Sequence, residues 1–214
     1  IYPCQVMPGS ELENWYWKRK YKPYTKEQIE NILIEMFKIV PRYCRVMRVM
    51  REIPPDYIVA GTTKIDLRKD IEEELRRKKI KLKEIRYREI GFALRNSNFS
   101  VSKTSEKQEV SDMGEIGFQK DFDLNLKLKI TKYRASGGEE YFLELINSED
   151  ILFGLLRLRI FDNNKQVIIR ELHIYGQALK LGEMGKIGQH IGLGKWLLDE
   201  AEKITRKTEI SKLK

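Results

Sequence analysis

The C-terminal half of the chain has the order strands, irregular loop, glycine-containing turn and helix, and this order constrains the fold more than any other feature. Apolar and polar residues alternate in the first strand-like run. A glycine-containing turn follows the first run, and an asparagine-containing turn follows the third. Such a pattern predicts an antiparallel meander. The runs are 124–130, 141–146, 151–161 and 167–175, with turns at Ser136-Gly137-Gly138 and Asp162-Asn163-Asn164.

A helix is expected from about Leu193 to Arg206, with one apolar face, directly after the turn Gln189-His190-Ile191-Gly192-Leu193-Gly194. The glycines let the backbone approach a ligand, and the unpaired amides of the helix's first turn point to where a pyrophosphate could bind. Lys195 adds positive charge nearby. A dinucleotide-binding fold is disfavoured, because the preceding strand is antiparallel and the G-x-G-x-x-G spacing is absent.

Two side chains on the last strand are candidate general bases by residue type, either directly or through water. These are Glu171 and His173. Each has an alternative interpretation that the sequence leaves open. Glu171 could form an ion pair with a neighbouring arginine, and His173 could be a strand histidine with its hydrogen bonds satisfied. His190 is expected to orient the loop.

The first 90 residues alternate between helical and strand-forming segments, as in the end of an α/β layer or barrel. Thr25 and Gln28 form a capping box for a helix that ends at Pro41. Asp66 begins a second helix. The apolar stripe expected to form the core of the first helix is Ile29, Ile32, Leu33, Met36, Phe37 and Val40, and the segment 42–51 is rich in strand formers.

The formal net charge of +9 favours a polyanionic partner such as RNA, although a generally basic protein fits the charge equally well. Basic and aromatic residues interleave from Trp15 to Tyr24, and such a mixture can stack on nucleotides and hold phosphates. Packing of these aromatics on a neighbouring domain is the alternative. Four arginines between Arg42 and Arg51 could contact phosphates, or pair with nearby carboxylates.

The two cysteines, Cys4 and Cys44, lack CxxC-type spacing, so we expect neither a metal site nor a disulfide framework. No apolar run approaches the length of a membrane span, and no signal peptide opens the chain. We therefore expect a cytoplasmic protein. The opening residues, Ile1-Tyr2-Pro3, are typical of the middle of a domain and suggest that an N-terminal part is missing.

The turn before the last helix resembles motif A of the GNAT acetyltransferases, whose signature is [Arg/Gln]-x-x-Gly-x-[Gly/Ala]. This resemblance implies that the last strand binds the pantetheine arm of acetyl-coenzyme A through its backbone, and that the turn binds the pyrophosphate. The residues implied in coenzyme binding are Glu171, Leu172, His173, Ile174, Gly188, Gln189, His190, Ile191, Gly192, Leu193, Gly194 and Lys195.

Longer motifs resemble the catalytic subunit of Elongator, whose members typically read RELHVYG, then QHxGxG, then EEAE. The corresponding runs are 170–176, 189–194 and 199–202, and Gly154 to Arg159 matches the family's GLLRLR strand. Near the N-terminus, Tyr21-Lys22-Pro23-Tyr24 and 48–54 resemble the end of the family's radical S-adenosylmethionine domain. The likeness covers most of the chain except about residues 93–123.

The resemblance implies a tRNA-modifying enzyme that hydrolyses or activates acetyl-coenzyme A when tRNA binds. The product would be a carboxymethyl group at carbon 5 of wobble uridine 34, made with a radical from S-adenosylmethionine at an iron–sulfur cluster. The expected partners are tRNA and either a second copy of the chain or other Elongator-like subunits. No association with a membrane is expected. Two alternatives are a protein-lysine acetyltransferase and a non-enzymatic RNA-binding module with a vestigial coenzyme site.

Departures from the family limit what this chain can do. The cluster cysteines would lie upstream of Ile1, and the family's final strands, with a substrate-side tyrosine, would follow Lys214. Where some members bind a metal, this chain offers Leu82, Tyr87 and Phe92, so we expect no zinc. We therefore predict two α/β parts. Residues 1–92 would end a radical S-adenosylmethionine domain, and 93–214 would form a GNAT-type domain with a polar insertion at about 96–123.

Overall fold

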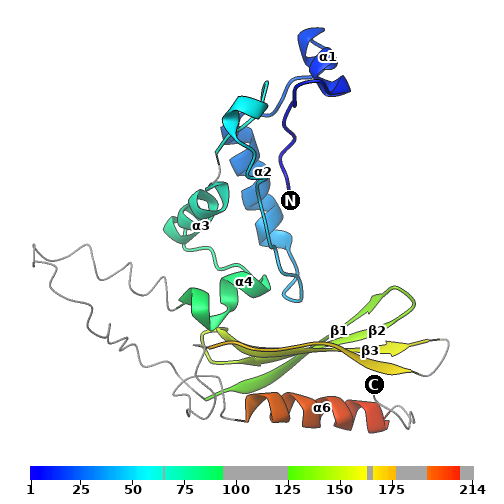
Figure 1. Cartoon of the computed structure of the whole chain (residues 1–214). Coiled ribbons are helices and arrows are strands. Elements are labelled where there is room, and N and C mark those ends of the chain that lie inside the picture. The colour runs from blue at the N-terminus through cyan, green and yellow to red at the C-terminus, as the bar shows by residue number, and fades with distance from the viewer. Residues whose placement is uncertain (65, 94–124, 163–165, 177–191, 208–214) are drawn as a thin grey trace, which may run out of the picture. The chain divides into compact units, whose positions relative to one another are not determined.

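A computed structural model describes residues 1–64, 66–93, 125–162, 166–176 and 192–207 of the 214-residue chain. The described parts belong to two compact units, Ile1–Arg86 and Tyr87–Lys214 (Figure 1). The polar insertion expected at about 96–123 lies outside the described residues.

The first unit is helical. Its elements are α1 (Glu11–Trp17), α2 (Lys26–Ile39), the short 3-10 helix η1 (Pro55–Tyr57), α3 (Leu67–Arg77) and the start of α4 (Ile85–Arg88). Helices α2 and α3 share an apolar core in which Phe37, Leu67 and Leu75 are almost fully buried. An antiparallel bridge between Val6 and Ala60 joins two extended segments of this unit.

The N-terminus of α2 confirms the predicted capping box. The Thr25 side chain accepts from the backbone N–H of Gln28, and the Gln28 side chain accepts from the backbone N–H of Thr25. The predicted apolar stripe is partly wrong, because Ile32 and Met36 are exposed while Ile34 is buried. The core-facing side of the helix is rotated toward Ile34 relative to the predicted stripe.

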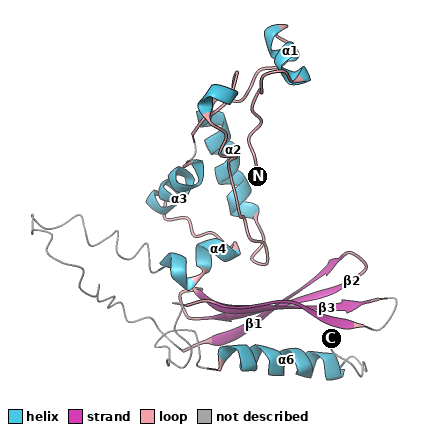
Figure 2. Cartoon of the chain, in the orientation of Figure 1, coloured by secondary structure: helices cyan, strands magenta, loops and turns pink. Residues whose placement is uncertain are grey.

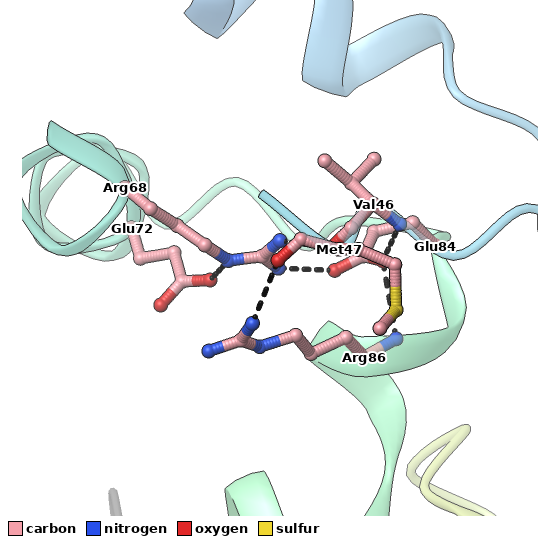
Figure 3. Close-up of polar contacts among 6 residues, drawn as sticks. All are labelled: Val46, Met47, Arg68, Glu72, Glu84 and Arg86. Carbon is pink, nitrogen blue, oxygen red and sulfur yellow. Dashed lines mark hydrogen bonds and ion pairs between the residues drawn. The ribbon is translucent and has the colours of Figure 1, made fainter. Parts of the chain in front are cut away.

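The prediction of strand structure from residue 42 to 51 is wrong, since the described backbone there is turns and irregular segments. Side chains hold this segment in place of a sheet ladder. Glu84, which is fully buried, accepts from the backbone N–H groups of Val46 and Arg86, each at 3.1 Å (Figure 3). The guanidinium of Arg68 donates to Glu84 at 2.6 Å and to the backbone oxygen of Val46.

Arg68 is the centre of this network. Besides Glu84, its guanidinium binds Glu72 at 2.5 Å and lies 5.3 Å from the ring centre of Phe37. Burial raises the pKa of Glu72 more than the positive charge of Arg68 lowers it. Arg86 donates to the backbone oxygen of Met47 at 3.0 Å. The two arginines therefore satisfy backbone groups that no strand partner satisfies.

The second unit is built on a four-stranded antiparallel sheet in the order β1-β2-β3-β4, which confirms the predicted meander. Figure 2 shows the strands of this sheet in magenta. The strands are β1 (Lys127–Ala135), β2 (Gly138–Ile146), β3 (Leu152–Phe161) and β4 (Val167–Ile174). Ser136 and Gly137 both have positive φ, at 46° and 73°, as a two-residue type I′ hairpin requires.

Helix α6 (Leu193–Lys207) covers one face of this sheet and confirms the predicted C-terminal helix. Leu197 and Ala201 of α6 are fully buried in a cluster with apolar side chains from the sheet. The cluster includes Leu143 and Leu145 of β2, Leu156 and Leu158 of β3, and Val167 of β4.

The opposite sheet face carries ion pairs. Arg88 of α4 binds Glu144 of β2 at 2.5 Å, and both side chains are almost fully buried. Glu140, also buried, accepts from Arg159 of β3 and, at 2.5 Å, from Arg170 of β4. The fold is thus mixed α/β, as predicted, with a dry sheet face under α6 and a charged face on the other side. No helix within the described ranges is long and apolar enough to cross a membrane.

Candidate functional site

Strand β4 lies at the edge of the sheet, and among the described residues no strand pairs with its outer side. Tyr175 donates its backbone N–H to Phe153 at 2.8 Å, and Leu155 lies opposite His173. Since antiparallel ladders alternate, the backbone groups of His173 point toward β3 and those of Leu172 and Ile174 point toward the free edge. Two N–H groups and two carbonyls are thus presented to an extended ligand.

A β-bulge controls which side chains of β4 face α6. The register shifts between Arg157 and Leu158, so Arg170 is an extra residue on β4. Val167 lies in the core beneath α6, and strict alternation would place Glu171 and His173 on that same face. The bulge turns both polar side chains to the opposite face.

Glu171 and His173, the predicted general bases, contact each other. Nε2 of His173 lies 3.2 Å from Oε1 of Glu171, and the imidazole stacks on Tyr175. Glu171 also pairs with Nε of Arg157 at 2.5 Å. The ion pair that the sequence left open as an alternative is therefore present, and it holds one carboxylate oxygen while the other faces the histidine.

Arg157 links Glu171 to β1. Its Nη1 donates to the hydroxyl of Tyr133 at 3.1 Å, and its guanidinium lies 4.8 Å from the ring centre of Phe142. Burial lowers the pKa of Arg157, but the hydrogen bond and charge of Glu171 outweigh it, so the pKa is raised overall. Arg157 is cationic at any pH at which the protein is folded.

The N-terminus of α6 follows a glycine whose backbone is in the left-handed region. Gly192 has φ of +80°, and a side chain added there would meet no atom within 4 Å. Its carbonyl accepts the first helical hydrogen bond, from Trp196 at 3.0 Å. The N–H groups of Leu193, Gly194 and Lys195 lie in the first turn, so no carbonyl of the helix can accept from them. The first turn holds no acidic residue.

Gly154 brings the end of β4 and the start of α6 together. A methyl group on Gly154 would lie 2.8 Å from Cδ1 of Ile174 and 3.4 Å from Cδ1 of Leu197. A methyl group on Gly194 would touch Ile174 at 3.8 Å. The absence of a side chain at Gly154 therefore lets Ile174 and Leu197 converge, which puts the open helix terminus beside the strand's free edge.

The structure thus joins part of the predicted site. Leu172 and Ile174 offer backbone groups, while Gly192 to Lys195 form the helix terminus. The predicted residues Gly188, Gln189, His190 and Ile191 lie outside the described residues. No group of three metal-binding side chains occurs among the residues described.

The sequence prediction missed Arg157, Tyr133 and Gly154. The charge alternation of Leu156-Arg157-Leu158-Arg159 against the acidic residue on the next strand was the signal for Arg157. The other two depend on strand register.

The first 77 residues match the family described as the Radical_SAM C-terminal domain. The chain is 35% identical, over 96% of its length, to a "tRNA uridine(34) acetyltransferase" of Dehalococcoides mccartyi, and 30% identical to "Elongator complex protein 3" of Schizosaccharomyces pombe. It is similar to a structure of Elp3 from Methanocaldococcus infernus with an N-terminal deletion (1–46), with 100% of this chain covered, a TM-score of 0.77 and 28% identity. The resemblance to the catalytic subunit of Elongator is confirmed.

The chain spans less than half the length of these relatives. It covers 42% of the Dehalococcoides protein, 36% of the Schizosaccharomyces protein and 48% of the Methanocaldococcus structure. The sequence similarity extends over both units, and the radical S-adenosylmethionine family match lies within the first.

Proposed function

We propose that this chain is part of a cytoplasmic enzyme that modifies carbon 5 of tRNA wobble uridine 34, and that its second unit binds acetyl-coenzyme A. The enzyme would hydrolyse or activate the coenzyme when tRNA binds, and would work with a second copy or with other Elongator-like subunits. We also propose that the radical S-adenosylmethionine part ends near residue 92 and the acetyltransferase part follows it. The observation that carries the proposal is the free edge of β4 beside the open N-terminus of α6.

An acyl-coenzyme A fits these groups in two places. The amides of its pantetheine arm can pair with the outward backbone groups of Leu172 and Ile174, as an added strand would. Its pyrophosphate can accept from the N–H groups in the first turn of α6, which have no partner in the described part of the chain, and the helix dipole and Lys195 add positive potential there. Gly192 supports this fit, because its open surroundings leave room for a ligand.

Glu171 and His173 would act on the opposite sheet face. With Arg157 on one carboxylate oxygen, Glu171 holds the histidine through the other oxygen. His173 is more than half exposed, so it can take a proton from water or from an acceptor group. Glu171 is then the residue that orients the base.

The radical step needs groups that this chain does not supply. The match to the Radical_SAM C-terminal domain supports S-adenosylmethionine and an iron–sulfur cluster for the whole protein, but this chain contains only two cysteines, which is fewer than such a cluster requires. Coenzyme binding is the part of the reaction that the described residues fit.

The tRNA would bind largely to the first unit. Residues 1–86 contain 20 Lys and Arg against 13 Asp and Glu, whereas the remaining 128 residues contain 21 against 19. Seven of the nine excess positive charges therefore lie in the first unit, and phosphates are the partners they attract.

The coenzyme proposal is tested by substitution of Gly192. Gly192→Val should abolish acetyl-coenzyme A binding measured by calorimetry, because a branched side chain at positive φ distorts the helix terminus. Gly137→Val is the matched control, since Gly137 has φ of +73° and equally open surroundings but lies in the β1–β2 turn. Equal loss in both variants, or normal binding by Gly192→Val, would refute the proposed site.

The tRNA proposal is tested by filter binding at several salt concentrations. Affinity should fall steeply as salt rises, because counterions released from tRNA drive the association. The Gly192→Val protein should bind tRNA as the unsubstituted protein does. Salt-independent binding, or none, by the intact natural protein would contradict a role in tRNA modification.

A further inference from the structure

The segment from Trp15 to Tyr24, which we call the aromatic-basic segment, displays large rings that the fold does not bury. Trp15, Trp17 and Tyr24 are 47%, 66% and 60% exposed, and α1 has no buried residue. Solvent-facing rings at this density mark a surface that binds something.

The ring of Trp17 is held in one orientation. Its indole N–H donates to Glu13 at 3.2 Å, and the ring packs edge-on against Tyr16 with centres 5.0 Å apart. Glu13 is further occupied by the backbone N–H of Gly9 at 2.7 Å. A fixed ring with an open face can stack on a flat ligand without losing much conformational freedom.

The basic residues beside these rings lack acidic partners. Helices α1 and α3 end in the same backbone motif, with Arg19 and Lys79 at positive φ and the following N–H bonded to the carbonyl five residues before it. At the end of α3, Glu74 binds both Arg77 and Lys78. At the end of α1, no acidic side chain within the described ranges pairs with the basic run Lys18, Arg19 and Lys20.

A groove of about 570 Å³ adjoins the segment. Tyr16 and Tyr24 line it together with Lys22, and Lys64, which also lines it, binds Asp70. Its volume is within the range of pockets that hold small organic groups. The groove thus combines aromatic faces with one lysine that has no acidic partner in the described part of the chain.

We propose that the aromatic-basic segment and its groove bind an unpaired stretch of RNA. Bases stack on the exposed rings, and Lys18, Arg19, Lys20 and Lys22 hold the phosphates. Unpaired bases are required because bases within a duplex present only their edges. The positive charge excess of residues 1–86 matches this partner. The identity of the RNA as tRNA rests on the proposed function; the binding surface does not.

The test measures binding of the full chain to a labelled, uridine-rich RNA of about 12 nucleotides, single-stranded or annealed to its complement. Trp17→Ala should weaken single-strand binding on the order of tenfold, because a stacked base is lost. RNA should also quench tryptophan fluorescence. Trp196→Phe should keep most of that quenching, since Trp196 lies in the second unit.

A pair of lysine substitutions tests the phosphate contacts. Lys20→Ala should lower the slope of log affinity against log salt by about 0.7, the value for one phosphate of a single strand. Lys38→Ala removes the same charge from the last turn of α2, where Lys38 pairs with Glu35. This substitution should leave the slope unchanged.

Three outcomes would overturn the proposal. They are equal affinity for single and double strands, unchanged affinity in Trp17→Ala, or equal slopes for the two lysine variants. If Trp17→Ala lost binding to an acidic peptide while it kept RNA binding, the segment would be assigned to a protein partner instead. If the intact natural protein binds the single strand in this way but does not modify tRNA, the proposed function fails and the RNA surface stands.

Discussion

The two units hold their polar networks in place by different means. In the second unit, Arg157 and Glu171 face each other because they are opposite residues in the β3–β4 register. In the first unit, Glu84 joins Val46 and Arg68, which lie on segments that share no ladder. In the second unit the backbone is already held by the sheet ladder, and the polar network adds to it. In the first unit the polar network itself holds the backbone segments together. Removing its central carboxylate should therefore have different consequences in the two units.

Glu84→Gln should have the largest effect. The amide would oppose either the guanidinium of Arg68 or the two backbone N–H groups with its own donor, in a site without water access. We expect a loss of about 4 kcal/mol in the free energy of unfolding. Urea denaturation with hydrogen exchange would place the loss in the first unit.

Glu171→Gln is the matched control for that substitution. The same change in the second unit breaks a partly exposed pair whose strands remain joined, so it should cost about 1 kcal/mol. Equal losses in the two variants would mean that register does not protect the sheet, and the comparison between the units would be wrong.

Leu197→Ala tests what holds the second unit. Leu197 is fully buried between α6 and the sheet, so its truncation should cost about 3 kcal/mol. The adjacent Leu198 is 36% exposed, and Leu198→Ala should cost well under 1 kcal/mol. The melting temperatures of both variants are measured by thermal unfolding. Similar melting temperatures would show that α6 does not depend on this core.

The sequence predicted most of the second unit because its elements repeat regularly. Alternation in the first run and the turns between runs indicated the four strands, although β1 continues to Ala135 and not only to Ile130. The turn before α6 located the helix start to within a residue. The faces of β4 were not predictable in this way. The bulge at Arg170 inserts one residue, and a bulge depends on the partner strand rather than on the pattern of β4 itself.

The first unit was predictable only where signals are local. Thr25 and Gln28 are three residues apart, so their capping box could be read directly from the sequence. The burial of Ile34 in place of Ile32 depends on where α3 packs, and the shape of 42–51 depends on Glu84, about 40 residues away. Strand-forming residues such as Val46 and Val49 gave no indication of that distant carboxylate.

Arg19→Gly and Lys79→Gly should each stabilise the fold slightly. Both residues occupy the left-handed position that glycine adopts without steric cost at the end of a helix. We expect a gain of about 0.5–1 kcal/mol in each, after the greater freedom of glycine in the unfolded chain is counted. Denaturant midpoints give the stability. Only Arg19→Gly should also weaken single-stranded RNA binding, and equal weakening in Lys79→Gly would show that any basic helix end binds RNA.

Glu74→Gln should have the smallest effect and should depend on pH. Hydrogen bonds from Arg77 and Lys78 lower the pKa of Glu74 to about 2 in the folded protein, from 4.5 when it is unpaired. A carboxyl group whose folded pKa is depressed stabilises the fold above the unfolded pKa, and that stabilisation is lost as pH falls toward the folded pKa. Any difference in denaturant midpoint between Glu74→Gln and the unsubstituted chain should therefore be present at pH 6 and disappear near pH 2. The Glu74 side chain is 30% exposed, whereas Glu84 in the same unit is fully buried. A pH-independent difference, or one as large as that of Glu84→Gln, would mean that the number of ion pairs, rather than their burial, holds the first unit together.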